Sequence, residues 1–336
     1  MSRRPRAERE LSLLERAALF APLNVPAPAP VRPELVEGPS FFPKQDGAST
    51  GSARTVPGVS PPPDTLAAIP AEFLAGADAG EDDFTPPPLT PGETRIDRGL
   101  LAEAGMIVPG APVGPLAEEF RLIKRQLFVT RQRLSAAGEA EKARTLLVCS
   151  ARPDDGKTFC AINLALSVAA ERDTEVLLVD ADVAKPDVCR RLGLPASAGL
   201  LDALYDGAVD PESLVIRTDV PHFSVLPAGA KTAMDTELLS SARTRAVIAR
   251  LLAANPRRLV IFDSPPALAA SPAAVLAMLV GQVMLVVRAD RTPDSEVRAA
   301  VQALDGCQHI GLVLNAVSFV PDRHRFGSYY GQELPS

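Results

Sequence analysis

Tryptophan is absent from this chain of 336 residues, and tyrosine, histidine and cysteine are scarce, at three, three and four residues. The cysteines show no C-x-x-C or histidine-paired spacing, which argues against a zinc site and a disulfide framework and fits a reducing cytosol. The net charge of −6 argues against binding of nucleic acid.

The chain also lacks a convincing apolar segment for a membrane. Residues 2–21 mix arginine and glutamate and have no apolar core, so no secretory signal is expected. The uncharged run from 264 to 287 is long enough to span a bilayer. Its prolines and glycine divide it, however, and favour a buried helix followed by a strand of parallel sheet over a transmembrane helix.

Proline is unevenly placed, because 20 of the 33 prolines lie before residue 116. Residues 1–96 are rich in Pro, Ala and Gly and are predicted to be disordered, since they bury too little apolar surface to offset chain entropy. Residues 97–320 are expected to form the folded domain. A flexible C-terminal tail, 321–336, contains a tyrosine pair.

The domain is predicted to open with a helix over 116–134. Its apolar residues recur at spacings of four, three and four, which is one helical stripe: Leu116, Phe120, Ile123 and Leu127. Charged residues, Glu118, Arg121 and Lys124 among them, occupy the other positions. The pattern alone allows a solvated face or a surface for self-association.

From residue 145 onward, strand and helix patterns alternate with short connections. Strands are expected at 145–149, 175–180, 222–226, 258–263, 282–288 and 310–315. Helices are expected at 157–171, 186–192, 199–205, 236–254, 272–280 and 294–304. This order predicts an α/β fold with a mostly parallel sheet, helices on both faces, and a ligand site at the carboxyl ends of the strands.

A phosphate-binding loop is predicted between the first strand and the first helix of this series. Residues 150–158 read Ser-Ala-Arg-Pro-Asp-Asp-Gly-Lys-Thr, close to G-x-x-x-x-G-K-[ST] but with alanine for the first glycine. Backbone N–H groups, the helix N-terminus and the lysine bind phosphates in such loops, and the threonine hydroxyl can ligate Mg²⁺. The predicted nucleotide-contacting residues are Arg152, Pro153, Asp154, Asp155, Gly156, Lys157, Thr158 and Phe159.

Carboxylates end two further strands. Asp180 and Asp182 follow one apolar run, and Asp263 ends another. An aspartate at one strand end is usually a turn or cap residue, but three in one α/β pattern suggest a magnesium site with a base for an attacking hydroxyl. Thr158, Asp180 and Asp263 are the predicted metal ligands.

These motifs together resemble the kinase domain of bacterial tyrosine autokinases of capsule and exopolysaccharide production, which are P-loop NTPases of MinD/ParA-like type. The likeness covers roughly residues 97–331 and includes Asp-Ser-Pro-Pro at 263–266 and the E-x-x-R-x-x-R oligomerisation motif, matched by Glu118, Arg121 and, by type, Lys124. A narrower resemblance is to autokinases of exosortase-linked exopolysaccharide systems. The oligomerisation motif makes self-association the better interpretation of that helix.

The resemblance implies an ATP- and Mg²⁺-dependent tyrosine kinase with Lys157, Asp180, Asp182 and Asp263 as catalytic residues. A homo-oligomer is implied, in which a neighbouring subunit phosphorylates Tyr329 and Tyr330. Other implied partners are an inner-membrane activator of the chain-length-determinant type and tyrosine-phosphorylated biosynthetic enzymes. The implied location is cytoplasmic, peripheral at the inner membrane through that partner.

Three departures from the family pattern keep alternatives open. Asp154 replaces the family's usual glycine, Ala184 its arginine, and Arg152 lies where MinD/ParA relatives have a signature lysine. Asp154 places a carboxylate near anionic phosphates and costs backbone freedom. A MinD/ParA-like ATPase switch and a non-catalytic nucleotide-binding scaffold are therefore the alternative functions.

Overall fold

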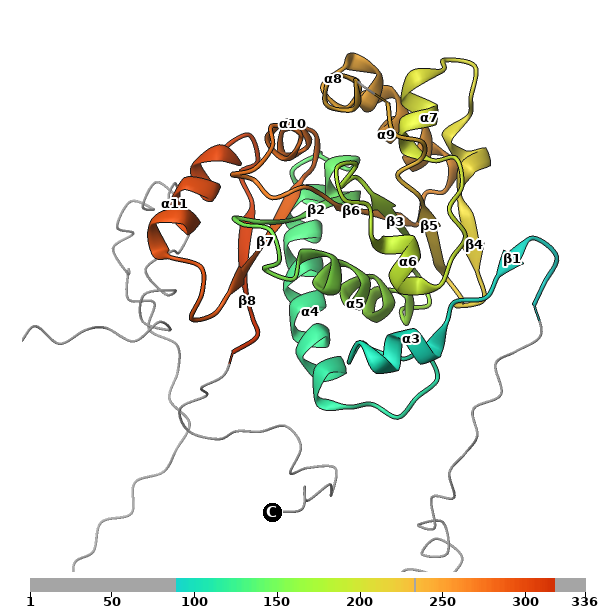
Figure 1. Ribbon diagram of the computed structural model, residues 1–336, viewed down its shortest axis with the longest axis horizontal. Helices are drawn as coiled ribbons and strands as arrows, with labels where there is room; N and C mark the ends of the chain where they lie inside the picture. Colours follow the sequence, from blue (N-terminus) through green and yellow to red (C-terminus); the bar gives the residue numbers. More distant parts are fainter. Residues whose placement is uncertain (1–88, 233, 318–336) are drawn as a thin grey trace, which may run out of the picture. The chain divides into compact units, whose positions relative to one another are not determined.

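The computed structural model describes residues 89–232 and 234–317 (Figure 1). The predictions for residues 1–88 and for the C-terminal tail, Tyr329 and Tyr330 included, lie outside this part of the chain. Within it, no helix combines the length and apolar character needed to cross a membrane.

The described strands form one sheet of eight, in the order β1-β4-β5-β3-β6-β2-β7-β8. Their bounds are β1 Glu93–Thr94, β2 Thr145–Ser150, β3 Glu175–Asp180, β4 Ile216–Thr218, β5 Phe223–Leu226, β6 Arg258–Asp263, β7 Gln282–Arg288 and β8 Ile310–Asn315. Neighbouring strands are parallel except for β4 and β5, which are antiparallel. The expected mostly parallel sheet is confirmed.

The central strands are buried on both faces because they are continuous apolar runs, as parallel sheets require. Every residue of β2 and β6 is buried. One core cluster includes Phe120, Leu127 and Leu164, and the other, on the opposite face, includes Leu251 and Leu276. Helices therefore cover both faces, as predicted.

The helices alternate with the strands along the chain. Their bounds are α3 Arg98–Glu103, α4 Pro115–Ala136, α5 Lys157–Ala169, α6 Val188–Leu192, α7 Leu200–Tyr205, α8 Asp235–Leu239, α9 Ala242–Ala254, α10 Pro272–Leu279 and α11 Asp294–Ala303, with short 3₁₀ turns at Lys142–Arg144 and Pro211–Leu214. The uncharged run 264–287 contains α10 and all of β7 except its last residue, Arg288, which are the helix and strand that its prolines favoured.

The single helix predicted over 236–254 is wrong, because the structure has two, α8 and α9. Side-chain hydroxyls at the junction donate to the last carbonyls of α8 and so satisfy its end: Ser241 Oγ bonds Leu238 O at 2.7 Å, and Thr244 Oγ1 bonds Leu239 O at 2.9 Å. Such local bonds compete with helix continuation. Strands β1 and β4 and helix α3 were not predicted.

Helix α4, which contains the predicted 116–134 helix, packs on α5. Phe120, Leu127 and Leu134 are its buried residues. Lys124 turns toward α5, where its Nζ donates to Ser167 O at 3.1 Å and pairs with a Glu171 carboxylate oxygen at 2.5 Å. Two of the three predicted oligomerisation residues, Glu118 and Arg121, pair with each other on the helix surface.

Candidate active site

The predicted phosphate loop connects β2 to α5 and ends at Gly156, the residue before the helix. Gly156 has φ of 96°, in the left-handed region that favours glycine. A Cβ at this position would lie 2.0 Å from the side-chain nitrogen of Asn315. The left-handed backbone favours glycine here, and a Cβ would also push the Asn315 amide aside, which supports a tight loop that presents its amides at the start of α5.

Asp154, which replaces the family's glycine, also has a left-handed backbone, with φ of 65°. Aspartate tolerates this conformation better than most residues. Its side chain is 68% exposed and lies 3.4 Å from Lys185 Nζ. The substitution is thus accommodated by the loop, and the carboxylate lies in solvent beside a cation.

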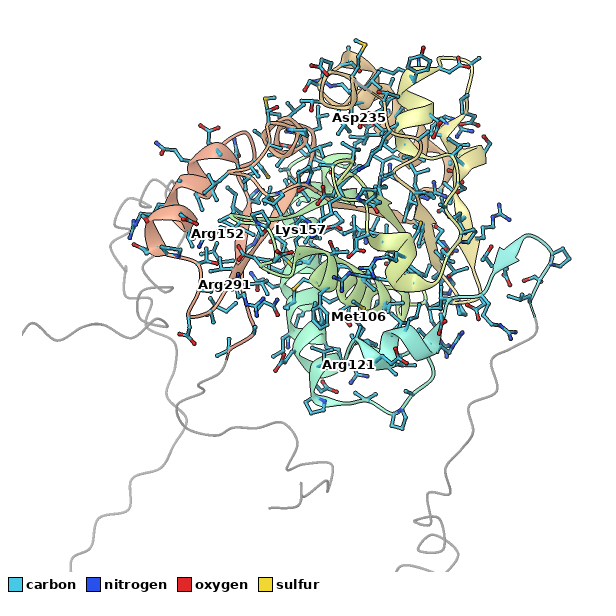
Figure 2. All side chains as sticks on the ribbon, in the orientation of Figure 1. Met106, Arg121, Arg152, Lys157, Asp235 and Arg291 are labelled. Atoms are coloured by element: carbon cyan, nitrogen blue, oxygen red, sulfur yellow. The ribbon has the colours of Figure 1, made fainter. Side chains whose placement is uncertain are left out.

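Lys157, labelled in Figure 2, lies in the first turn of α5, and the carboxylates of three aspartates act on its charge. Its Nζ is 2.6 Å from Asp182 Oδ2, and its side chain is only 12% exposed. Burial lowers the pKa of Lys157, but Asp263, Asp182 and Asp180 together outweigh burial and raise the pKa above its usual value. The Lys157 ammonium is therefore charged, and a phosphate oxygen can replace the Asp182 carboxylate as its partner.

Asp180 and Asp263 lie side by side because they are register partners at the ends of β3 and β6. Burial and the neighbouring Asp263 carboxylate raise the pKa of Asp180 to about 7. Burial raises the pKa of Asp263 to about 6, although the Lys157 charge opposes this. Two negative carboxylates buried side by side raise the free energy of the folded state, and a cation bound between or beside them lowers it again.

The carboxylate oxygens differ in what they already bind. Asp180 Oδ2 accepts from the N–H groups of Asp187 and Val188, at 3.0 and 3.1 Å, at the start of α6. Asp180 Oδ1 and both oxygens of Asp263 are buried without a hydrogen-bond partner. Unpartnered buried oxygens are uncommon and call for a ligand.

These oxygens fit Mg²⁺ that arrives with a nucleotide. No group of three or more His, Cys, Asp and Glu residues in the described ranges is arranged to hold a metal by itself. Mg²⁺ usually takes one or two carboxylates, waters and substrate phosphates. Asp263, Thr158 and the free oxygen of Asp180 match that requirement.

The ends of β7 and β8 hold the phosphate loop from the other side. Arg288 donates to Asp154 O at 3.1 Å, and Thr292 Oγ1 donates to Asp155 Oδ1 at 3.0 Å. Asn315 Nδ2 donates to Asp155 O at 3.0 Å. Sequence reasoning assigned no role to these three residues. The available signal was that Arg288 and Asn315 end the apolar strands β7 and β8, with Thr292 four residues further on.

Arg152 extends from the loop toward α11 (Figure 2). Its Nε lies 3.1 Å from Glu296 Oε2, and the side chain is 47% exposed. Its backbone N–H donates to Asp155 Oδ2 at 3.1 Å. Phe159 and Thr158 lie in the first turn of α5, and Pro153 lies in the loop.

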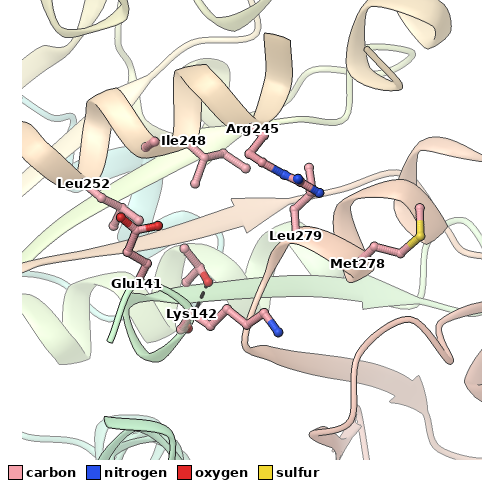
Figure 3. A pocket seen from close by; sticks show the side chains of 9 residues that line it. Glu141, Lys142, Arg245, Ile248, Leu252, Met278 and Leu279 are labelled. Atoms are coloured by element: carbon pink, nitrogen blue, oxygen red, sulfur yellow. Dashed lines mark hydrogen bonds between the residues drawn. The ribbon is translucent and has the colours of Figure 1, made fainter. Parts of the chain in front are cut away.

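A separate pocket lies at the amino end of β2, beside Thr145 (Figure 3). Its volume is about 180 Å³, and Ile248, Leu252 and Leu279 line it together with Lys142. Because β2 has six residues, this pocket is about 20 Å from the phosphate loop at the strand's other end. It takes no part in the site.

Sequence and structural comparisons show which known proteins this chain resembles. The chain matches no family model. It is 29% identical to the tyrosine-protein kinase YwqD of Bacillus subtilis over 239 residues, 70% of this chain and 95% of that protein. It is also 35% identical to the putative tyrosine-protein kinase EpsB of Ralstonia nicotianae. That match covers 54% of this chain and 24% of EpsB. The kinase domain of the Escherichia coli tyrosine kinase ETK matches with 26% identity and a TM-score of 0.53, over 68% of this chain and 92% of that one.

A glycine-ended loop, a lysine that begins a helix, and aspartates ending two neighbouring parallel strands define a P-loop nucleotide-binding protein. Sequence similarity and the shared fold narrow the class. The chain belongs to the bacterial tyrosine-protein kinases. The expected family and fold class are confirmed, and the narrower likeness to exosortase-linked systems stays a prediction.

Proposed function

We propose that this chain is an ATP- and Mg²⁺-dependent protein-tyrosine autokinase that phosphorylates Tyr329 and Tyr330 of a neighbouring copy. The observation that carries the proposal is the position of Lys157, charged and held 2.6 Å from Asp182 beside the unpartnered oxygens of Asp263. At the edge of the sheet where the parallel strands end, this arrangement provides an ammonium group that can bind phosphate. The carboxylate oxygens beside it can bind a metal cation.

Each residue then has a separate role. Lys157 and the amides of the loop would hold the β- and γ-phosphates, and Thr158, Asp263 and Asp180 would hold Mg²⁺, which would supply positive charge to the transferred group. When Lys157 turns to phosphate, Asp182 loses its cation and becomes able to accept the proton of the tyrosine hydroxyl. The hydroxyl oxygen bonds the γ-phosphorus, the bond to the ADP oxygen breaks, and ADP leaves.

Phosphotyrosine mass spectrometry after incubation of the full chain with Mg-ATP tests this function. We expect phosphate on Tyr329 and Tyr330, and its loss in Lys157→Met. Lys142→Met is the matched control, because Lys142 is 51% exposed, pairs with Glu139 and lies at the opposite end of β2. The control should retain full labelling.

Two outcomes would favour the alternatives. ATP hydrolysis without phosphotyrosine would support a MinD/ParA-like switch, in which water is the acceptor. Nucleotide binding with neither activity would support a scaffold.

The same proposal includes the assembly of the chain and its recruitment to a membrane. One relative, CapB of Staphylococcus aureus, is named as a putative tyrosine-protein kinase, and another, ExoP of Rhizobium meliloti, as a succinoglycan biosynthesis transport protein. We therefore propose a homo-oligomer that regulates exopolysaccharide synthesis and export, recruited to the inner membrane by a chain-length-determinant partner. Co-purification of the chain with membranes only when that partner is expressed would support this.

A further inference from the structure

A buried carboxylate lies within the phosphate loop itself, that of Asp155, which is only 2% exposed. Each of its oxygens accepts one hydrogen bond: Oδ2 from the N–H of Arg152 at 3.1 Å, and Oδ1 from the hydroxyl of Thr292 at 3.0 Å. We propose that Asp155 and Thr292 are positioning residues whose side chains hold the loop in its phosphate-binding shape without touching the nucleotide. The inference deepens the proposed function and rests on it, since it concerns the same loop.

The loop is shaped to direct its N–H groups toward an anion. Asp154 and Gly156 are left-handed, with φ of 65° and 96°, and Asp155 between them is not. Alternation of this kind turns successive N–H groups to one side and forms an anion-binding concavity. The carbonyls of Asp154 and Asp155 accept from side chains that end β7 and β8, Arg288 and Asn315. Within the described ranges, no hydrogen bond engages the N–H groups of residues 154–156, so these groups are available to phosphate.

The carboxylate of Asp155 closes this loop. By accepting the N–H of Arg152, three residues earlier, it ties the start of the loop to its end. Hydrogen bonds to an ionised group are about twice as strong as neutral ones, so the two bonds to Asp155 can hold one loop shape. Because each of its oxygens has a protein donor, this carboxylate differs from that of Asp263, whose oxygens are unpartnered and suited to a metal.

Thr292 is a fixed partner for that carboxylate. It lies between β7 and α11, and its own N–H donates to Arg288 O at 3.0 Å. Pro293 follows it and restricts its backbone. Without the hydroxyl, Asp155 Oδ1 has no donor and the carboxylate can rotate away from Arg152. The ligand must then order the loop as it binds, which lowers affinity.

Isothermal titration of the full chain with Mg-ADP and with Mg-tripolyphosphate, which has no base or ribose, tests the proposal. Thr292→Val keeps the side chain's shape and removes the donor, so both affinities should fall by the same factor, about tenfold. Thr292→Ser keeps the donor and should retain both affinities. In Asp155→Ala the hydroxyl has already lost its partner, so the addition of Thr292→Val should weaken binding no further.

The matched control is Thr244→Val, which also removes a hydroxyl that donates to a protein oxygen, Leu239 O at 2.9 Å, at the junction of α8 and α9. It should lower the free energy of urea unfolding and change neither affinity. Thr292→Val would behave in the same way if Thr292 served folding alone, and that result would overturn the proposal.

Two other results would also overturn it. A further loss when Thr292→Val is added to Asp155→Ala would show that the hydroxyl acts on something other than this carboxylate. A loss confined to Mg-ADP would show that Thr292 contacts the base or ribose. If the wild-type chain bound neither ligand, the proposed function would be contradicted, and this inference with it.

Discussion

Replacing Asp263 by asparagine should stabilise the nucleotide-free protein while abolishing phosphate transfer. Asp263 is 0% exposed, and both its oxygens lack a hydrogen-bond partner. Its pKa is about 6, raised by burial from an ordinary 3.8, with Lys157 opposing the effect. The carboxylate is therefore retained at a cost to folding, as expected of a group that serves a ligand.

The size and sign of that cost follow from linkage. Because the pKa is raised in the folded chain, the destabilisation is absent below pH 3.8, grows as pH rises, and is complete above about pH 6. The difference between the two pKa values corresponds to about 3 kcal/mol. Asparagine has nearly the same shape and does not ionise, so this pH-dependent cost disappears, whereas any cost of burying its amide is the same at every pH.

Urea unfolding of the nucleotide-free chain at about pH 8 and about pH 4.5 measures the effect. The change in unfolding free energy caused by Asp263→Asn should be more stabilising at the higher pH by about 2 kcal/mol, since wild-type Asp263 is mostly protonated at the lower pH. Asp305→Asn, at an exposed aspartate, is the control and should show no such difference. An equal effect of Asp263→Asn at both pH values would refute the reasoning.

Three further changes have expected results. Asp154→Asn keeps the side chain's shape and removes a negative charge near the bound phosphates. The affinity for ADP, measured by titration, should therefore rise about threefold, and the gain should vanish at high salt. An unchanged affinity at low salt would show that the Asp154 carboxylate is too far from the phosphates to repel them. Gly156→Ala should weaken ADP binding by at least about tenfold, because alanine at φ of 96° is strained and its Cβ meets Asn315; unchanged affinity would contradict the crowding. Phe120→Ala should lower the free energy of urea unfolding by about 3–4 kcal/mol, because Phe120 is a core residue of α4 and only 3% exposed. Leu122→Ala, at a 53% exposed position of the same helix, should lower it far less.

The central strands were predictable because a strand buried on both faces is a continuous apolar run. The bounds of β3, β6 and β7 match the predicted ranges for this reason. The bounds of β8 also match, although β8 is an edge strand without a buried residue. Strands β1 and β4 have only two and three residues, too few for any hydrophobic pattern, and form only by pairing with other strands. Their existence depends on tertiary contacts.

The gathering of site residues was also predictable, since the carboxyl ends of parallel strands meet at one edge. Lys157, Asp180, Asp182 and Asp263 do come together there. What each oxygen binds was not predictable. Asp180 caps α6, Asp182 holds the lysine, and Asn315 contacts a loop residue 160 positions away in the chain. Such pairings depend on side-chain geometry that no local pattern encodes.

Strand order has a consequence for how such a kinase can be attached to its surroundings. β1 and β8 are the two edges of the sheet, seven strand spacings or about 34 Å apart. The described residues begin at 89, shortly before β1, and end at 317, shortly after β8, so the two ends of the described chain attach at opposite edges of the sheet. A binding partner that covered one of these edges would therefore leave the other edge accessible.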